Sequence, residues 1–303
     1  MPALSEARSA NASFSTAYLP VALFVGGTSG IGRATAEAFA RSTKGHAHIV
    51  IVGRNRQAGE AVLASFPQAA TSRYEFVQCD VSLMQNVHAT AAALRASLPK
   101  LNYLMASPGL MTLSGRDETA EGIDKKLAVD YYARWTFVKE LVPLLRNAKD
   151  AGEDAKVLTL LAAGEGGNID LDNLGLKRGY SLPKAMEAAA TYNDLMIETF
   201  AAQQPDMAFT HMFPGLVRTG LTKPAHWALA PVWPVMQALM YPFSISAADS
   251  AEYVLHALLE GEKGFFRRGP QGQLLKNEGK GYFATEEAKT KLWDHTVEAT
   301  TVV

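Results

Sequence analysis

The chain has 303 residues, 48% hydrophobic and 19% charged, a composition that fits one large domain with a sizeable core. Its 29 basic and 30 acidic residues give a formal net charge of -1. Because these charges form no long runs, they indicate no nucleic-acid partner and favour a small neutral or anionic ligand. Cys79 is the only cysteine, which excludes an internal disulfide and a cysteine-based zinc site, and we expect no metal.

The N-terminal residues 1–20 lack the continuous apolar core of a signal peptide. We expect them to form an extension that frays or lies on the surface, before a single domain over residues 21–303. Together with the lone cysteine, this favours a cytoplasmic location.

Short apolar runs alternate with longer amphipathic segments from residue 21 onward, the pattern of a parallel sheet covered by helices on both faces. The predicted strands are VALFVGG (21–27), HIVIVGR (48–54), YEFVQCDV (74–81), LNYLMASP (101–108), AKVLTLLA (155–162) and MAFTHMFPG (207–215). The predicted helices are RATAEAFARS (33–42), AGEAVLASF (58–66), 84–98, 122–149, 181–203 and 247–259. The fold class is therefore α/β, a doubly wound Rossmann-type parallel sheet in a single domain with a C-terminal substrate lid.

The lid is predicted at about residues 220–246. Its apolar stretch from His226 to Phe243 approaches membrane-spanning length, but Pro231, Pro234 and Pro242 interrupt it, so we expect no transmembrane segment. A surface helix pair that completes the core is one alternative. Peripheral membrane contact through the tryptophans of this stretch is another.

A glycine-rich loop, VGGTSGIGR, follows the first predicted strand and opens the first helix. Its glycines permit a tight turn, a close approach of backbone N–H groups to a pyrophosphate and close helix packing, while the helix N-terminus favours phosphate charge. A glycine turn without a ligand is the alternative. The predicted cofactor contacts here are Gly26, Thr28, Ser29, Gly30, Ile31 and Gly32.

Arg54 follows the second strand, at the place where an acidic residue would bind a ribose 2′-hydroxyl. A guanidinium there predicts charge-assisted hydrogen bonds to a 2′-phosphate, with Asn55 as a helper. NADP(H) is therefore favoured over NAD(H). A solvated surface arginine is the alternative.

Several ordered motifs, namely the Gly26–Gly30–Gly32 spacing, CDV, YSLPK and PGLVRT, resemble those of short-chain dehydrogenases/reductases over roughly residues 21–259. The resemblance is to an atypical retinol-dehydrogenase-like branch with an altered catalytic tetrad. It implies further cofactor contacts at Asp80 and Val81 beside the adenine, at Gly109, and at Pro214, Gly215, Val217 and Thr219 around the nicotinamide.

The same resemblance makes Tyr180 of YSLPK the proton donor. Lys184, four residues on and on the same helix face, would lower the pKa of the phenol from near 10 and bind the nicotinamide ribose. Asp130 occupies the position of the family's asparagine, where it would raise the pKa of Lys184 or hold a proton-relay water; an ordinary surface aspartate is the alternative. Ala162 replaces the family's serine, and losing such a donor typically costs about 3 kcal/mol of transition-state stabilisation.

The leading hypothesis is an NADPH-dependent oxidoreductase of secondary metabolism that reduces an aldehyde or ketone of a lipophilic small molecule, or oxidises the alcohol. A non-redox enzyme of the same fold (isomerase, dehydratase or cyclase) and an NADP(H)-responsive binding protein are the alternatives. The resemblance also suggests a homodimer formed through the two long helices.

Overall fold

The computed structural model describes residues 2–112, 114–219, 241–279 and 281–301. Its centre is a seven-stranded sheet in the order β3-β2-β1-β4-β5-β6-β9, in which all neighbours pair in parallel. The strands are β1 (Val21–Val25), β2 (His48–Gly53), β3 (Arg73–Gln78), β4 (Tyr103–Ala106), β5 (Lys156–Leu160), β6 (Ala208–Met212) and β9 (Gly264–Arg268). The predicted doubly wound sheet is confirmed.

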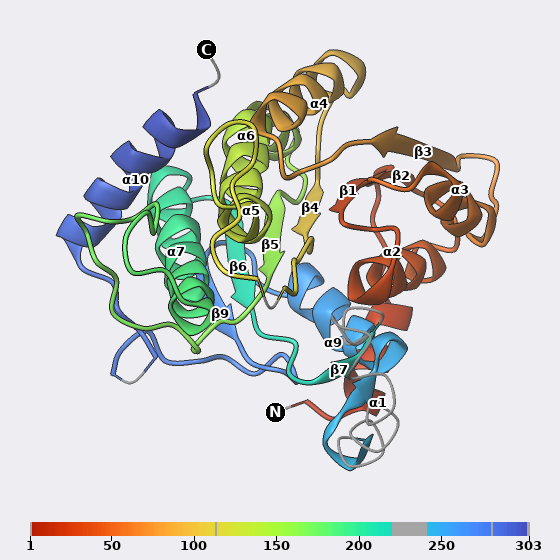
Figure 1. The fold of residues 1–303 in the computed structure, drawn as a ribbon. Coiled ribbons are helices and arrows are strands. Elements are labelled where there is room, and N and C mark those ends of the chain that lie inside the picture. The colour runs from red at the N-terminus through yellow and green to blue at the C-terminus, as the bar shows by residue number, and fades with distance from the viewer. Residues whose placement is uncertain (1, 113, 220–240, 280, 302–303) are drawn as a thin grey trace, which may run out of the picture.

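Helices cover both faces of this sheet (Figure 1). One face carries α1 (Leu4–Ala12), α2 (Gly30–Ser42), α3 (Arg56–Ala64) and α9 (Ala247–Leu259). The other carries α4 (Met84–Ser97), α5 (Lys125–Leu127), α6 (Ala133–Asp150), α7 (Leu182–Gln203) and α10 (Glu286–Thr300). Strands β1, β2, β4, β5 and β6 are buried along their whole length, which explains why their sequences are continuous apolar runs rather than alternating ones.

The helix that leads into α6 contains a single π-helical turn, Ala128–Tyr132, which joins α5 to α6. Such a turn adds one residue to the helix and shifts the faces on which later side chains lie. Asp130 lies within the turn and Arg134 follows it, so their directions depend on this irregularity.

The N-terminal extension forms a helix that packs on α9, so of the two alternatives expected for it the fraying one is wrong, while its mostly exposed residues agree with a place on the surface. Ala7 and Asn11 of α1 are buried, Arg8 pairs with Asp249 at 2.7 Å, and the Asn11 amide donates to the Glu252 carboxylate at 2.8 Å. The sequence interpretation also missed β9 and α10, which lie beyond the last predicted element.

Most of the predicted lid lies outside the described residues, as do the alternatives offered for that stretch. Its described end contains a 3₁₀ turn (Tyr241–Phe243) and strand β8 (Ile245–Ser246), which pairs with β7 (Val217–Arg218). No helix within the described ranges is long and apolar enough to cross a membrane.

Candidate functional site

A cavity opens at the carboxyl ends of β1 and β4, where the chain crosses to opposite sides of the sheet. Ligands of doubly wound proteins bind at this kind of switch point. The predicted contacts that line it are Gly26, Thr28, Ser29, Gly30, Ile31, Gly32, Arg54, Asp80, Val81, Gly109, Pro214 and Thr219. Lining residues not assigned to the site from the sequence are Gly53, Cys79, Ser107, Pro108, Leu110, Val129, Arg134, Leu160 and Leu161.

The glycine loop packs directly against the end of β4. Gly26 has a positive φ of 86°, and a side chain there would place its Cβ 2.7 Å from the Pro108 nitrogen. A Cβ on Gly32 would lie 2.3 Å from the Ser107 hydroxyl and 2.5 Å from the Gly26 carbonyl oxygen. The two glycines therefore let the loop pack closely on the end of β4, and the N-terminus of α2, which begins at Gly30, lies at the cavity. This geometry suits a phosphate group.

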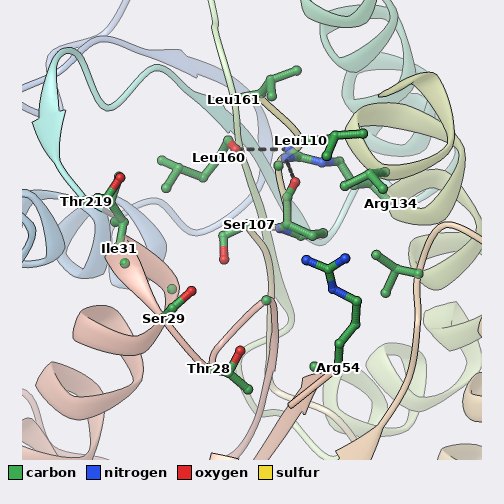
Figure 2. Close-up of a pocket in the computed structure, with 18 of the residues that line it drawn as sticks. Thr28, Ser29, Ile31, Arg54, Ser107, Leu110, Arg134, Leu160, Leu161 and Thr219 are labelled. Atoms are coloured by element: carbon green, nitrogen blue, oxygen red, sulfur yellow. Dashed lines mark hydrogen bonds between the residues drawn. The ribbon is translucent and has the colours of Figure 1, made fainter. Parts of the chain in front are cut away.

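Arg54 extends from the end of β2 toward the centre of the cavity (Figure 2). The residue is exposed, and nowhere in the described ranges does its guanidinium have a hydrogen-bond or ion-pair partner, so it is available to an anion. Asn55 differs from the expectation: it does not line the cavity, and its side-chain oxygen caps α3 by accepting from the Ala58 N–H at 3.0 Å.

Asp80 and Val81 form the wall after β3. The Asp80 carboxylate accepts hydrogen bonds from the Ser82 N–H at 3.0 Å and from the Ser82 hydroxyl at 2.8 Å, which hold the turn. Burial raises the pKa of the neighbouring Cys79 thiol, so this group stays neutral and unreactive. This part of the cavity therefore serves for shape rather than chemistry.

Arg134 is a buried cation at the other end of the cavity. Its guanidinium bridges the ends of two neighbouring strands, donating to the Leu160 carbonyl at 3.0 Å and the Pro108 carbonyl at 2.5 Å (Figure 2). Burial lowers the pKa of Arg134 to about 10, an effect that Asp130 partly opposes, so the side chain stays charged at neutral pH. Leu110, Leu160 and Leu161 complete a mostly apolar wall around it.

Asp130 pairs with Lys126 and not with Lys184, which corrects the expected role of this aspartate. The Asp130 and Lys126 side chains are buried and lie 2.6 Å apart. Asp130 accepts the Leu110 N–H at 3.0 Å, and Lys126 donates to the Leu110 carbonyl at 2.9 Å. The pair therefore holds the loop after β4 by both backbone groups of Leu110, and the surface-aspartate alternative is also wrong.

Tyr180 and Lys184 do not share a helix face. Ser181 is the N-cap of α7, with extended backbone, so Tyr180 precedes the helix that contains Lys184. The ammonium of Lys184 is exposed and lies 3.3 Å from the Gly179 carbonyl, beside a separate surface cavity. Neither residue lines the cavity described above.

The Tyr180 hydroxyl is buried and has no hydrogen-bond partner among the described residues. Burial raises the pKa of this phenol, Asp124 and Asp130 raise it further, and Arg116 opposes them. The expectation that Lys184 lowers the pKa of Tyr180 is therefore wrong.

Ala162 does not line the cavity. Its N–H donates to His211 Nε2 at 3.2 Å, while Leu161 faces the cavity. Neither side chain can donate a hydrogen bond to a substrate. Gly215 and Val217 also lie off the cavity, since Gly215 packs near Pro270 and Val217 is buried in β7.

The sequence carries only an ambiguous signal at Arg134. Lys126, Asp130 and Arg134 follow one another at four-residue spacing, which places alternating charges along one side of a helix. Such a row normally indicates a solvated face. Here the row is buried, and only the packing of α6 against β4 and β5 shows it.

Comparison with known proteins agrees with this geometry. The family model described as short chain dehydrogenase matches residues 20–157. The protein named oxidoreductase AN1596, from Emericella nidulans, is 34% identical over 259 residues, which cover 83% of this chain and 75% of that protein. Polyprenol dehydrogenase from Mus musculus is 27% identical over 90% of this chain and 81% of its own length.

The fold also matches solved structures. A short-chain dehydrogenase from Sphingobium yanoikuyae in complex with NADPH superposes with a TM-score of 0.60 and is 18% identical. The match covers 82% of this chain and 87% of that protein. At this identity the likeness establishes the fold alone.

Proposed function

Because the chain belongs to the short-chain dehydrogenase/reductase family, we propose that it is an NADP(H)-dependent oxidoreductase that reduces a carbonyl group of a lipophilic small molecule, or oxidises the corresponding alcohol. The observation that carries the proposal is the pairing of an unpartnered cation, Arg54, with the bare backbone of the glycine loop in one cavity. The names of the relatives favour a redox enzyme over the non-redox alternatives.

The residues of the cavity fit a phosphorylated dinucleotide. Backbone N–H groups at the start of α2 would bind the pyrophosphate, Arg54 would bind the 2′-phosphate, and Asp80 and Val81 would flank the adenine end. When bound, the cofactor supplies or accepts the hydride. The chain itself contributes binding, orientation and exclusion of water.

The apolar lining of one side of the cavity supports the proposal of a lipophilic substrate. Leu110, Val129, Leu160 and Leu161 line the cavity and offer apolar surface with no side-chain donor. Figure 2 shows Leu110, Leu160 and Leu161 on the side of the cavity where Arg134 lies. The relative named polyprenol dehydrogenase acts, by its name, on polyprenol, and this name supports a lipophilic substrate.

We assign the proton to Tyr180. Its hydroxyl has no protein partner in the described part of the chain, but it is buried and lies off the cavity, so the assignment requires the segment before α7 to move when substrate binds. Its raised pKa keeps the phenol protonated at neutral pH, which suits donation during carbonyl reduction better than proton removal from an alcohol. Lys184 has no part in this assignment.

The test compares the binding of NADPH and NADH by titration calorimetry in the wild type and in Arg54→Ala. A lost charge-assisted contact of about 1.5–3 kcal/mol predicts NADPH binding about 10–100-fold weaker, with NADH unchanged. Arg56→Ala is the matched control, because Arg56 is exposed nearby but lies over the Phe76 ring and outside the cavity. Equal effects on both cofactors would overturn the NADP(H) assignment, and absence of binding to either would overturn the function.

A further inference from the structure

We propose that Arg134 makes the site select the reduced over the oxidised form of its cofactor. The inference rests on the proposed function and concerns the same cavity. A buried positive charge at the nicotinamide end repels the oxidised ring, which is a cation, and leaves the neutral reduced ring unaffected. The consequence is a site poised to bind NADPH and to release NADP⁺ after reduction.

The position of the charge follows from the two ends of the cavity. The glycine loop and Arg54 occupy the end suited to phosphates, so the ring end lies toward Leu110, Leu160 and Arg134 (Figure 2). The guanidinium lies between the ends of β4 and β5, held there by the carbonyls of Pro108 and Leu160. Two such bonds from one planar group fix its place.

The net charge of the buried row is positive. Lys126 and Asp130 neutralise each other through their 2.6 Å contact. Arg134 forms no ion pair with a described carboxylate and donates only to uncharged carbonyl oxygens. The two cations, Lys126 and Arg134, and the one anion, Asp130, therefore leave one uncompensated positive charge.

Screening of this charge by salt is weak. Arg134 is 1% exposed, so mobile ions do not surround it as they would a surface cation. Its pKa of about 10 keeps it charged across the neutral range. We expect NADPH to bind at least about tenfold more tightly than NADP⁺, which corresponds to about 1.4 kcal/mol.

The experiment measures the dissociation constants of NADPH and NADP⁺ by calorimetry on the full chain and compares their ratio between variants. Arg134→Met and Lys126→Gln each lower the net charge of the row by one, so the NADPH preference is expected to fall toward unity. Asp130→Asn raises the net charge by one, so the preference is expected to increase. Lys139→Gln is the control, because it removes an exposed cation from the same helix and is expected to leave the ratio unchanged.

The ratio separates charge from structure. A variant that only loosens the loop after β4 weakens the binding of NADPH and of NADP⁺ alike. The positive charge, in contrast, changes the binding of NADP⁺ alone. Arg134→Met leaves the Leu160 and Pro108 carbonyls without a donor, and this variant can unfold. In that case Lys126→Gln and Asp130→Asn, for which opposite shifts of the NADPH to NADP⁺ ratio are predicted, test whether the preference follows the net charge. A wild-type ratio near one, or a ratio that does not follow the net charge, overturns the inference while the proposed function stands. Failure of the wild type to bind either form overturns both.

Discussion

Nδ1 of His211 lies 2.6 Å from the Asp194 carboxylate, and both side chains are buried. Asp194 also pairs with Arg267 at 3.0 Å, and His211 Nε2 accepts the Ala162 N–H at 3.2 Å. Because an N–H can only donate, Nε2 is the unprotonated nitrogen and Nδ1 carries the proton toward Asp194. A neutral histidine therefore fixes the segment that follows β5.

This histidine predicts a loss of stability in acid. Burial lowers the pKa of His211 below its ordinary value of 6.5, although Asp194 opposes the shift. In the window below about pH 6.5 the unfolded chain binds a proton that the folded chain does not, so the free energy of unfolding falls as the pH falls. In His211→Gln, the free energy of unfolding is expected to lose the part of its pH dependence that His211 contributes. Urea unfolding between about pH 5 and pH 8 measures it, and an unchanged slope, compared with His46→Gln at a more exposed site, would contradict the assignment.

Gly32→Ala tests the contact between the glycine loop and β4. The new Cβ would lie 2.3 Å from the Ser107 hydroxyl and 2.5 Å from the Gly26 carbonyl, so the loop must move. We expect destabilisation of about 1–3 kcal/mol and weaker NADPH binding. Adding Ser107→Ala relieves only the first clash and is expected to restore little. Gly115→Ala, which meets nothing within 4 Å, is expected to change stability by less than about 0.5 kcal/mol.

Tyr180→Phe separates a catalytic from a structural hydroxyl. Removing a buried hydroxyl that lacks a partner is expected to leave the denaturation midpoint unchanged or slightly higher. Loss of the proton donor is expected to slow carbonyl reduction about 100-fold or more. NADPH consumption with a panel of lipophilic aldehydes and ketones, with product mass, measures the second effect. Lys184→Met is expected to be nearly neutral, and strong inactivation there with normal turnover in Tyr180→Phe would reverse the assignment.

Helix α10 predicts that the chain is a monomer. It packs on α7, and Trp293 lies 5.1 Å, between ring centroids, from Trp135 of α6 and from Phe200 of α7. A homodimer through these two long helices would have to displace α10. Light scattering is expected to give the mass of one chain, 32.6 kDa, and Leu292→Asp, at a buried position of α10, is expected to promote association. A wild-type dimer whose mass is insensitive to Leu292→Asp would place the interface elsewhere.

The sequence by itself determined the sheet and the glycine-loop end of the cavity. Continuous apolar runs identify buried parallel strands, and the glycine spacing between a strand and a helix is a local pattern that needs no distant contact. Arg54 was predictable for the same reason, since a residue at the end of β2 must lie beside the loop after β1. The serine and proline at the start of α7 stand in the sequence, yet the expectation placed Tyr180 and Lys184 on one helix face, and the structure begins the helix at Leu182, after Tyr180.

Only the tertiary structure decided where the side chains of the YSLPK motif and of the charged row from α5 to α6 lie. The motif YSLPK fixes the spacing of Tyr180 and Lys184, but the directions of their side chains depend on where α7 begins and on what packs around the phenol. The charged row of Lys126, Asp130 and Arg134 reads as a solvated face until α6 docks on the sheet, where strand-end carbonyls and the Leu110 backbone take the place of water. These contacts join residues distant in the chain, so short-range patterns do not reveal them. Burial then makes Arg134 a poorly screened positive charge in the wall of the cavity.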